Sequence, residues 1–307
     1  MEIGRKGIVM SKKELQAIAR HMLHVYSGIL FHHQEFEAGN GEENVYEFAC
    51  PEFEALRSQY PLTEIAGKGS DFSRARKLLH NLAPRLAHCP WYDNHIPCNA
   101  LALLAYSLDQ PEHGINCLNK AKLFAECCLA LGIYARRVRI MPFSPYDFDN
   151  HVVTEIYDRH LAKWIMLDPT TDGYFIDADK TPLSLLEMRS KFANGEFITF
   201  VHSKDSLKDI RKLREKYLDT NQYICKNLFY FQVEQYSTFG EKGNFLHFVP
   251  LHFSIKETQQ ANLKYRMENL PAEQEDLRAS LIERADKLAE APEPERTALS
   301  SLLKKPC

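Results

Sequence analysis

The chain reads GINCLNKAKLFAECCLALGIYARRVRIM over residues 114–141, where a loop is followed by a predicted helix and a predicted strand. Residues 117–131 are almost wholly apolar on one helical face, and Gly132 suits the left-handed backbone that often ends a helix. Residues 134–142 then alternate in polarity as strand residues do. Cys117 lies where the loop becomes the helix, and the positive end of a helix dipole favours an anion such as a thiolate.

Two more strand patterns follow, at residues 151–157 and 163–167, and the connection between them has the length of a hairpin loop. Such short connections exclude parallel crossovers, so we predict an antiparallel sheet. A helix followed by an antiparallel meander indicates an α+β fold, with the helix of Cys117 packed on the sheet. The hairpin also brings His151, which opens its first strand, next to Asp168, which closes its second.

Further elements are predicted on both sides of this core. Ser11 and Glu14 form a capping box ahead of an amphipathic helix at 11–30. The other expected elements are a loop or short strand at 38–50, a helix from Ser70 that Pro84 ends, a short apolar helix at 99–108, a helix at 182–194, β-patterned residues at 222–254, polar helices from 257 and a solvated or disordered tail at 291–295. We therefore expect an N-terminal helical region at 1–69, a catalytic core at 70–255 and a helical, partly disordered tail at 256–307.

Composition excludes several classes of protein. With 307 residues, 45% hydrophobic and 26% charged, the chain has an ordinary globular composition and is long enough for one large or two modest domains. Its formal net charge of −3 provides no global basic field, so we expect no nucleic acid or membrane partner. The first residues, Met1 to Gly7, lack the apolar segment of a secretory signal, and we expect a cytoplasmic protein. Nothing in the sequence sets an oligomeric state.

Eight cysteines are present, at positions 50, 89, 98, 117, 127, 128, 225 and 307. Because the chain is neither small nor visibly secreted, we expect most of them to be reduced and buried, Cys127 and Cys128 above all. No Cys-x-x-Cys pair is present, and the histidines at 21, 24, 32 and 33 lack a matching third ligand. The aspartates at 172, 177 and 179 lack the full calcium-loop pattern. We therefore predict neither a metal nor a cofactor.

Cysteine, histidine and aspartate in this order suit a thiol acyl-transfer site. A thiol becomes nucleophilic when an imidazole takes its proton, and a carboxylate can orient that imidazole and stabilise its charged form. Taken singly, Cys117, His151 and Asp168 favour structural roles: a buried thiol, a strand residue and a turn residue. Each of them lies at the end of a predicted element, and together they favour catalysis.

The segment from Gly114 to Asp177 resembles the core of the transglutaminase-like superfamily, which shares its fold with papain-like cysteine proteases. Three blocks carry the resemblance: the cysteine block that ends in ALGIYAR (130–136), similar to the family's ALGIPAR; HVVTEIY (151–157); and KWIMLDPT (163–170), similar to the family's W-x-x-L-D-P-T. Weaker similarity to bacterial members extends through 183–189 and 223–229. The resemblance implies a papain-like core in which Cys117 is the nucleophile, His151 the general base and acid, and Asp168 the orienting carboxylate.

Two departures from the family pattern bear on the reaction. Crosslinking members carry Gln before and Trp after the cysteine, whereas this chain has Asn116 and Leu118 at these positions. They also carry Trp two residues after the histidine, whereas this chain has Val153. Those aromatic walls form the tunnel for acyl donor and amine, so we expect hydrolysis of a peptide or protein amide by a protease, amidase or deamidase. The alternative is a catalytically silent module of the same family that binds peptides or protein partners.

An acyl-transfer site also needs donors for the oxyanion. The backbone N–H of Cys117 is the natural first donor. For the second donor or for substrate contact, Asn116, Trp91 and Asn94 are the candidates, with Asn99 a further possibility. The alternatives to a role in catalysis are structural: Trp91 packs in the core, and the asparagines cap helices or form turns.

Overall fold

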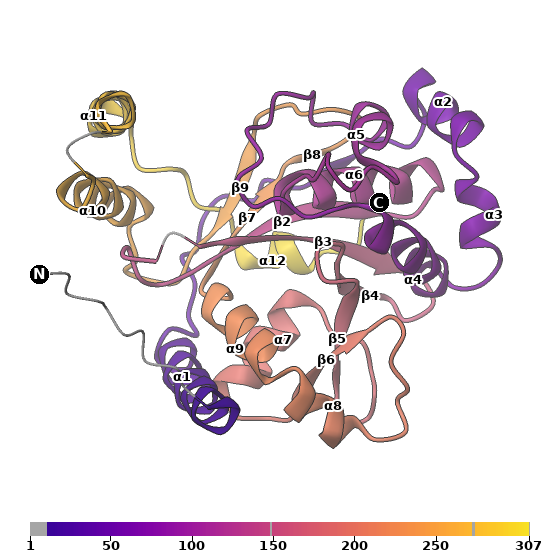
Figure 1. Ribbon diagram of the computed structural model, residues 1–307, viewed down its shortest axis with the longest axis horizontal. Coiled ribbons are helices and arrows are strands. Elements are labelled where there is room, and N and C mark those ends of the chain that lie inside the picture. Colours follow the sequence, from indigo (N-terminus) through magenta and orange to yellow (C-terminus); the bar gives the residue numbers. More distant parts are fainter. Residues whose placement is uncertain (1–10, 148, 272–273, 307) are drawn as a thin grey trace, which may run out of the picture.

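The computed structural model of the chain describes residues 11–147, 149–271 and 274–306 (Figure 1). Among these residues, seven strands form one sheet: β2 (Ala135–Met141), β3 (His151–Asp158), β4 (Lys163–Asp168), β5 (Gly173–Asp177), β6 (Ile198–His202), β7 (Tyr230–Glu234) and β9 (Phe245–Phe248). Their order is β6-β5-β4-β3-β2-β7-β9, and every neighbouring pair is antiparallel. A separate parallel pair joins β1 (Val45–Tyr46) to β8 (Tyr236–Ser237). The predicted α+β class with an antiparallel sheet is confirmed.

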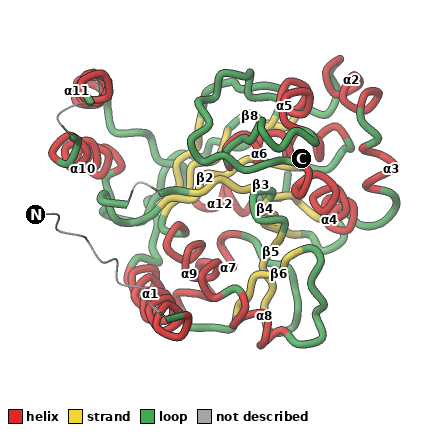
Figure 2. Tube along the Cα trace, in the orientation of Figure 1, coloured by secondary structure: helices red, strands yellow, loops and turns green. Residues whose placement is uncertain are grey.

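Helices cover both faces of the sheet, which gives the molecule three layers (Figures 1 and 2). One face carries α2 (Pro51–Gln59), α3 (Leu62–Ala66), α4 (Asp71–Leu82), α5 (Ala100–Ser107) and α6 (Cys117–Ala130). The other carries α1 (Lys12–His32), α7 (Leu185–Ala193), α9 (Leu218–Asn227) and α12 (Leu299–Leu303). A 3-10 turn, η1 (Ala83–Arg85), follows α4, and α8 (Ile210–Lys216) lies against β6. To one side, α10 (Ile255–Glu268) and α11 (Glu275–Glu290) form a helical pair.

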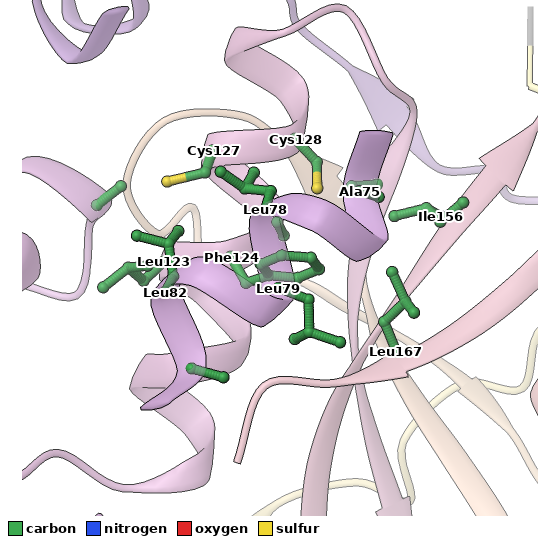
Figure 3. Close-up of a cluster of buried hydrophobic side chains, with 14 of the residues drawn as sticks. Ala75, Leu78, Leu79, Leu82, Leu123, Phe124, Cys127, Cys128, Ile156 and Leu167 are labelled. Atoms are coloured by element: carbon green, nitrogen blue, oxygen red, sulfur yellow. The ribbon is translucent and has the colours of Figure 1, made fainter. Parts of the chain in front are cut away.

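The core between α4, α6 and the sheet holds α6 in place (Figure 3). Leu78 of α4, Phe124 and Cys128 of α6 and Ile156 of β3 are all buried in one apolar cluster. Burial of each large apolar side chain stabilises the fold by about 1.5–3 kcal/mol. Cys127 and Cys128 are free and fully buried, which confirms the prediction for this pair. The N-terminus of α6 is therefore fixed against the sheet by packing further along the helix.

Local signals set the helix ends as the sequence predicts. At the start of α1, the Ser11 hydroxyl accepts the Glu14 N–H at 3.3 Å, and the Glu14 carboxylate accepts the Ser11 N–H at 2.7 Å. The Ser70 side chain caps α4 in the same way. Gly132 has a φ of +71° just after α6, a conformation that glycine adopts without strain.

The prediction that residues 222–254 are β-patterned throughout is wrong for their first part. Leu218–Asn227 form α9, and only the residues after this helix enter β7, β8 and β9. Aromatic residues such as Tyr223 suggested a strand, but the buried positions recur at helical spacing, at Leu218, Asn221, Ile224, Cys225 and Leu228. The short elements α2, α3, α8, β5 and β6 were also not predicted.

The C-terminal segment is part of the packed structure. The residues at 291–295 are largely exposed, but Thr297 donates its N–H to the His247 carbonyl at 2.9 Å, next to β9. Leu302 of α12 is buried, and the Trp164 indole N–H donates to the Lys304 carbonyl at 3.1 Å. The buried Leu302 side chain and these hydrogen bonds hold residues 297–304 against the sheet, and a partly disordered tail stays a prediction. Cys307 lies outside the described residues.

The division of the chain at residues 70 and 256 stays a prediction. In the described part of the chain, no helix combines the length and the apolar character that crossing a bilayer requires.

Candidate active site

Cys117 is the first residue of α6. Asn116 is the helix N-cap, and its side-chain oxygen accepts the Asn119 N–H at 3.2 Å. The first N–H groups of a helix have no acceptor within it, and the helix dipole places partial positive charge there. Cys117 is partly exposed. The position therefore combines access with stabilisation of negative charge.

A neighbouring backbone segment holds the residues before the nucleophile. Ile115 donates its N–H to the Ala87 carbonyl at 3.1 Å and accepts the Cys89 N–H, also at 3.1 Å. A Cβ added at Gly114 would lie 2.9 Å from the Cβ of Cys89, so this close approach requires glycine. The backbone that leads into Cys117 is thus fixed from outside α6.

The β3–β4 hairpin brings His151 and Asp168 together. Thr154 pairs with Leu167 in the antiparallel register, so Asp168 lies on the same side of the hairpin as His151 and diagonally across from it. His151 Nε2 lies 2.9 Å from Asp168 Oδ2, and both side chains are buried. Cys117 also acts on the His151 ring, where it raises the pKa of the imidazole. The three side chains therefore form one connected group.

Electrostatics favour a charged imidazole in this group. Burial lowers the pKa of His151, but the charge and hydrogen bond of Asp168, followed by those of Cys117, outweigh it and raise the pKa to about 10. Burial raises the pKa of Asp168, but His151 and hydrogen bonds from Thr171 and Thr170 lower it overall. At neutral pH the pair is therefore an imidazolium and a carboxylate.

Two threonines fix the carboxylate of Asp168. The Thr170 N–H donates to Oδ1 at 2.9 Å, and the Thr171 hydroxyl donates to Oδ2 at 2.7 Å. Tyr223 of α9 covers the imidazole of His151, and the two ring centroids lie 5.5 Å apart in an edge-on arrangement. Its hydroxyl donates to Asp149 at 3.2 Å. The imidazole is thus held between a fixed carboxylate and an aromatic wall.

The predicted asparagines form a network beside the nucleophile. Asn94 Oδ1 accepts from the side-chain amides of Asn116 at 3.1 Å and of Asn119 at 2.6 Å. The Asn94 amide donates to the Tyr92 carbonyl at 3.3 Å. The donors of Asn94 and Asn116 are therefore engaged within the protein, and their clearest role is to hold the loop against the start of α6.

Trp91 and Asn99 have different surroundings. Trp91 is 93% exposed, so the alternative of core packing is wrong for this residue. Asn99 is the N-cap of α5, where its side chain accepts the Ala102 N–H at 2.9 Å, as the capping alternative predicts. The backbone N–H of Cys117, at the first position of α6, remains the natural oxyanion donor.

Two charged or titratable residues of the site were not predicted. Lys120 follows Cys117 by one helical turn and is only 2% exposed, and its Nζ donates to the Leu86 carbonyl at 2.6 Å. The second residue is His88. Burial and the charge of Lys120 lower the pKa of His88; the charge of His151 also lowers it, and that of Asp168 raises it. The spacing of Lys120 from Cys117 was a usable signal, but a lysine on a helix is normally expected to face solvent.

Within residues 11–147, 149–271 and 274–306, no three side chains of histidine, cysteine, aspartate or glutamate converge in a way that suits a metal ion. The groups present at the site can supply a nucleophile, a proton donor and acceptor, and a backbone oxyanion donor. These are the components of acyl transfer through a thioester.

Comparisons with protein families, with curated proteins and with solved structures find no match to the chain. The functional interpretation therefore depends on the residues and geometry described above.

Proposed function

We propose that the protein is a transglutaminase-like cysteine enzyme that cleaves or transfers the acyl group of a peptide or protein amide through a thioester on Cys117. In this interpretation, α6 and the antiparallel sheet correspond to a papain-like core. The observation that carries the proposal is the 2.9 Å contact between His151 and Asp168, in a site where Cys117 also raises the pKa of His151. A buried imidazole that a carboxylate orients beside a thiol is an arrangement that activates a nucleophile.

The first half of the reaction forms the thioester. The Cys117 thiolate attacks the amide carbonyl carbon, and the developing oxyanion lies near the Cys117 N–H. The His151 imidazolium then gives its proton to the amide nitrogen as the carbon–nitrogen bond breaks. The products are a thioester on Cys117, a free amine or ammonia, and a neutral imidazole.

The second half releases the acyl group. His151 takes a proton from water as the water oxygen attacks the thioester, and the carbon–sulfur bond breaks to return the thiolate and a carboxylic acid. An amine in place of water gives transamidation. We favour water, because Asn116 and Leu118 stand where crosslinking members have Gln and Trp, and Val153 stands where they have a second Trp. The aromatic walls of their acyl-donor and amine tunnel are therefore missing. A peptide or protein substrate and a cytoplasmic location are part of this proposal.

The proposal is tested by measuring alkylation of Cys117 with iodoacetamide across pH, followed by mass spectrometry of the Cys117 peptide. We expect the wild type to react faster near neutral pH than a free thiol does, and His151→Ala to lose this advantage. His247→Ala removes a histidine from the edge strand β9, which β2 and β7 separate from β3, and serves as the matched control. If Cys117 reacts as an ordinary thiol in the wild type and in both variants, the enzyme proposal is wrong and a silent binding module is favoured.

A further inference from the structure

We propose that Lys120 is a positioning residue of this site: its buried cation balances the negative charge of Asp168 and of the Cys117 thiolate and so keeps the thiol in its reactive form. This inference rests on the function proposed above, since it assigns Lys120 a role in activating the same nucleophile.

Lys120 lies where such a role is geometrically direct. Residues three apart on a helix are neighbours on one face, so Lys120 is adjacent to Cys117 on α6. Its side chain is buried, and the Leu86 carbonyl at 2.6 Å holds its ammonium group. Among the described residues, no carboxylate lies within 4.0 Å of this ammonium. A buried cation without a direct ion pair is costly, and it requires compensation from charges further away.

Lys122, two residues further along α6, is a buried lysine whose ammonium group is paired directly with carboxylates, as is usual for a buried charge. It is also buried, but its Nζ lies 3.1 Å from Glu234 and 3.4 Å from Glu126, and it donates to the Thr238 carbonyl at 3.0 Å. Its charge is therefore neutralised by its own carboxylates. Lys120 has no such partners, and the anionic groups that act on it are Asp168 and then Cys117.

The charges of the active site explain what Lys120 supplies. In the reactive form, the thiolate of Cys117 and the carboxylate of Asp168 carry two negative charges, and the imidazolium of His151 carries one positive charge. This buried group has an excess of one negative charge, which desolvation penalises. The ammonium of Lys120 brings the total to zero. Without it, the group reaches neutrality more easily by returning a proton to the thiolate.

The surrounding titratable groups agree with a cation at neutral pH. Burial lowers the pKa of Lys120 to about 8, and the charges of Asp168 and Cys117 oppose this decrease. His88 faces Lys120 from the adjacent loop, and burial together with Lys120 lowers its pKa, so it remains a neutral ring. The cation is thus present below about pH 8 and lost above it.

The test compares alkylation of Cys117 across pH in the wild type, Lys120→Met, Lys120→Arg and Lys122→Met. We expect Lys120→Met to slow alkylation roughly tenfold or more at about pH 6, because one nearby charge shifts an ionisation by about one to three pH units. At about pH 9 the Lys120→Met rate converges with that of the wild type, because Lys120 itself has then lost its charge. Lys120→Arg retains a cation and restores fast alkylation near pH 6, and Lys122→Met leaves the profile unchanged.

The outcomes separate the two proposals. If the wild-type Cys117 is not unusually reactive, the proposed function fails. If Cys117 is reactive and depends on His151, but Lys120→Met follows the wild-type profile or is slowed equally at every pH, only the role of Lys120 is overturned. If Lys120→Met does not fold, Lys120→Gln removes the charge while keeping a donor for the Leu86 carbonyl, and the same comparison applies.

Discussion

Replacing Asp168 with asparagine removes the charge that keeps His151 protonated while preserving the size of the side chain. The effect is best measured in a Cys117→Ala background, because a thiolate that gives up its proton on folding would offset the proton that His151 gains. Burial by itself lowers the pKa of His151, and Asp168 supplies the largest opposing contributions. With Asp168 present, the folded protein holds a proton on His151 at a pH where the unfolded chain does not.

The size of the effect follows from this difference of one proton. With Cys117 present, the pKa of His151 is raised from 6.5 to about 10, so its stabilising contribution is complete below pH 6.5 and is lost as pH rises through about 10. Cys117→Ala removes the smaller contributions of Cys117 and keeps those of Asp168, so in this background the window ends below pH 10. Within this window, the free energy of unfolding decreases by about 1.4 kcal/mol per pH unit. Burial raises the pKa of Glu126 to about 7, so its contribution ends near pH 7. Burial lowers the pKa of Lys120 to about 8, and removal of Cys117 and Asp168, whose charges raise this pKa, adds to the difference between the two proteins in the same direction. The clean measurement is therefore made from about pH 7 to pH 8.

The assay is urea denaturation of Cys117→Ala and of Cys117→Ala with Asp168→Asn at several pH values in this interval. We expect the first protein to lose at least about 1.4 kcal/mol of stability per pH unit more than the second. Asp158→Asn in the same background is the control, because Asp158 is also buried and ends β3 but accepts backbone N–H groups of Phe72 and His160. Asp158→Asn should lower the free energy of unfolding at every pH without changing its slope against pH. If the free energy of unfolding has the same slope against pH with and without Asp168, the ion pair between His151 and Asp168 is refuted.

Three further predictions concern positions around the site. Gly173→Ala places a Cβ 2.5 Å from the Val201 carbonyl oxygen and still closer to the Phe200 ring, and it should lower the free energy of unfolding by on the order of 2 kcal/mol in urea denaturation. Leu302→Ala should cost about 2–5 kcal/mol in the same assay, because this side chain is buried in the core although it lies near the end of the chain; no loss would contradict the packed C-terminal segment. Trp91→Ala should leave stability within about 0.5 kcal/mol and leave Cys117 alkylation by iodoacetamide unchanged, because Trp91 is 93% exposed; a clear loss of stability in thermal melts would contradict this.

The parts of the fold that sequence predicts well are those with local causes. The capping box of Ser11 and Glu14, the left-handed Gly132 and the hairpin between β3 and β4 all depend on residues close in sequence. The same hairpin makes the contact between His151 and Asp168 predictable. Its short connection fixes the register, and the register places the two side chains within reach.

The remaining parts depend on contacts between distant segments. α9 contains aromatic residues that are common in strands, and only its burial against α1 and the sheet shows the helical period. The buried state of Lys120 depends on the Leu86 carbonyl, which reaches it from another part of the chain. The interaction of Asn94 with Asn116 and Asn119 joins a loop to the start of α6, with Asn94 at a φ of +60°. Sequence patterns report propensity and period, and they do not report which distant group satisfies a polar side chain.

The central claim is that Cys117 forms an acyl intermediate, and acetylation by p-nitrophenyl acetate tests it most directly. Peptide mass spectrometry after short incubation should find a hydroxylamine-sensitive acetyl group on Cys117 of the wild type, formed faster than on Cys89, which is also partly exposed. The label should be absent in Cys117→Ala and should form more slowly in His151→Ala. A folded wild-type protein in which Cys117 is acetylated no faster than Cys89 would contradict the account.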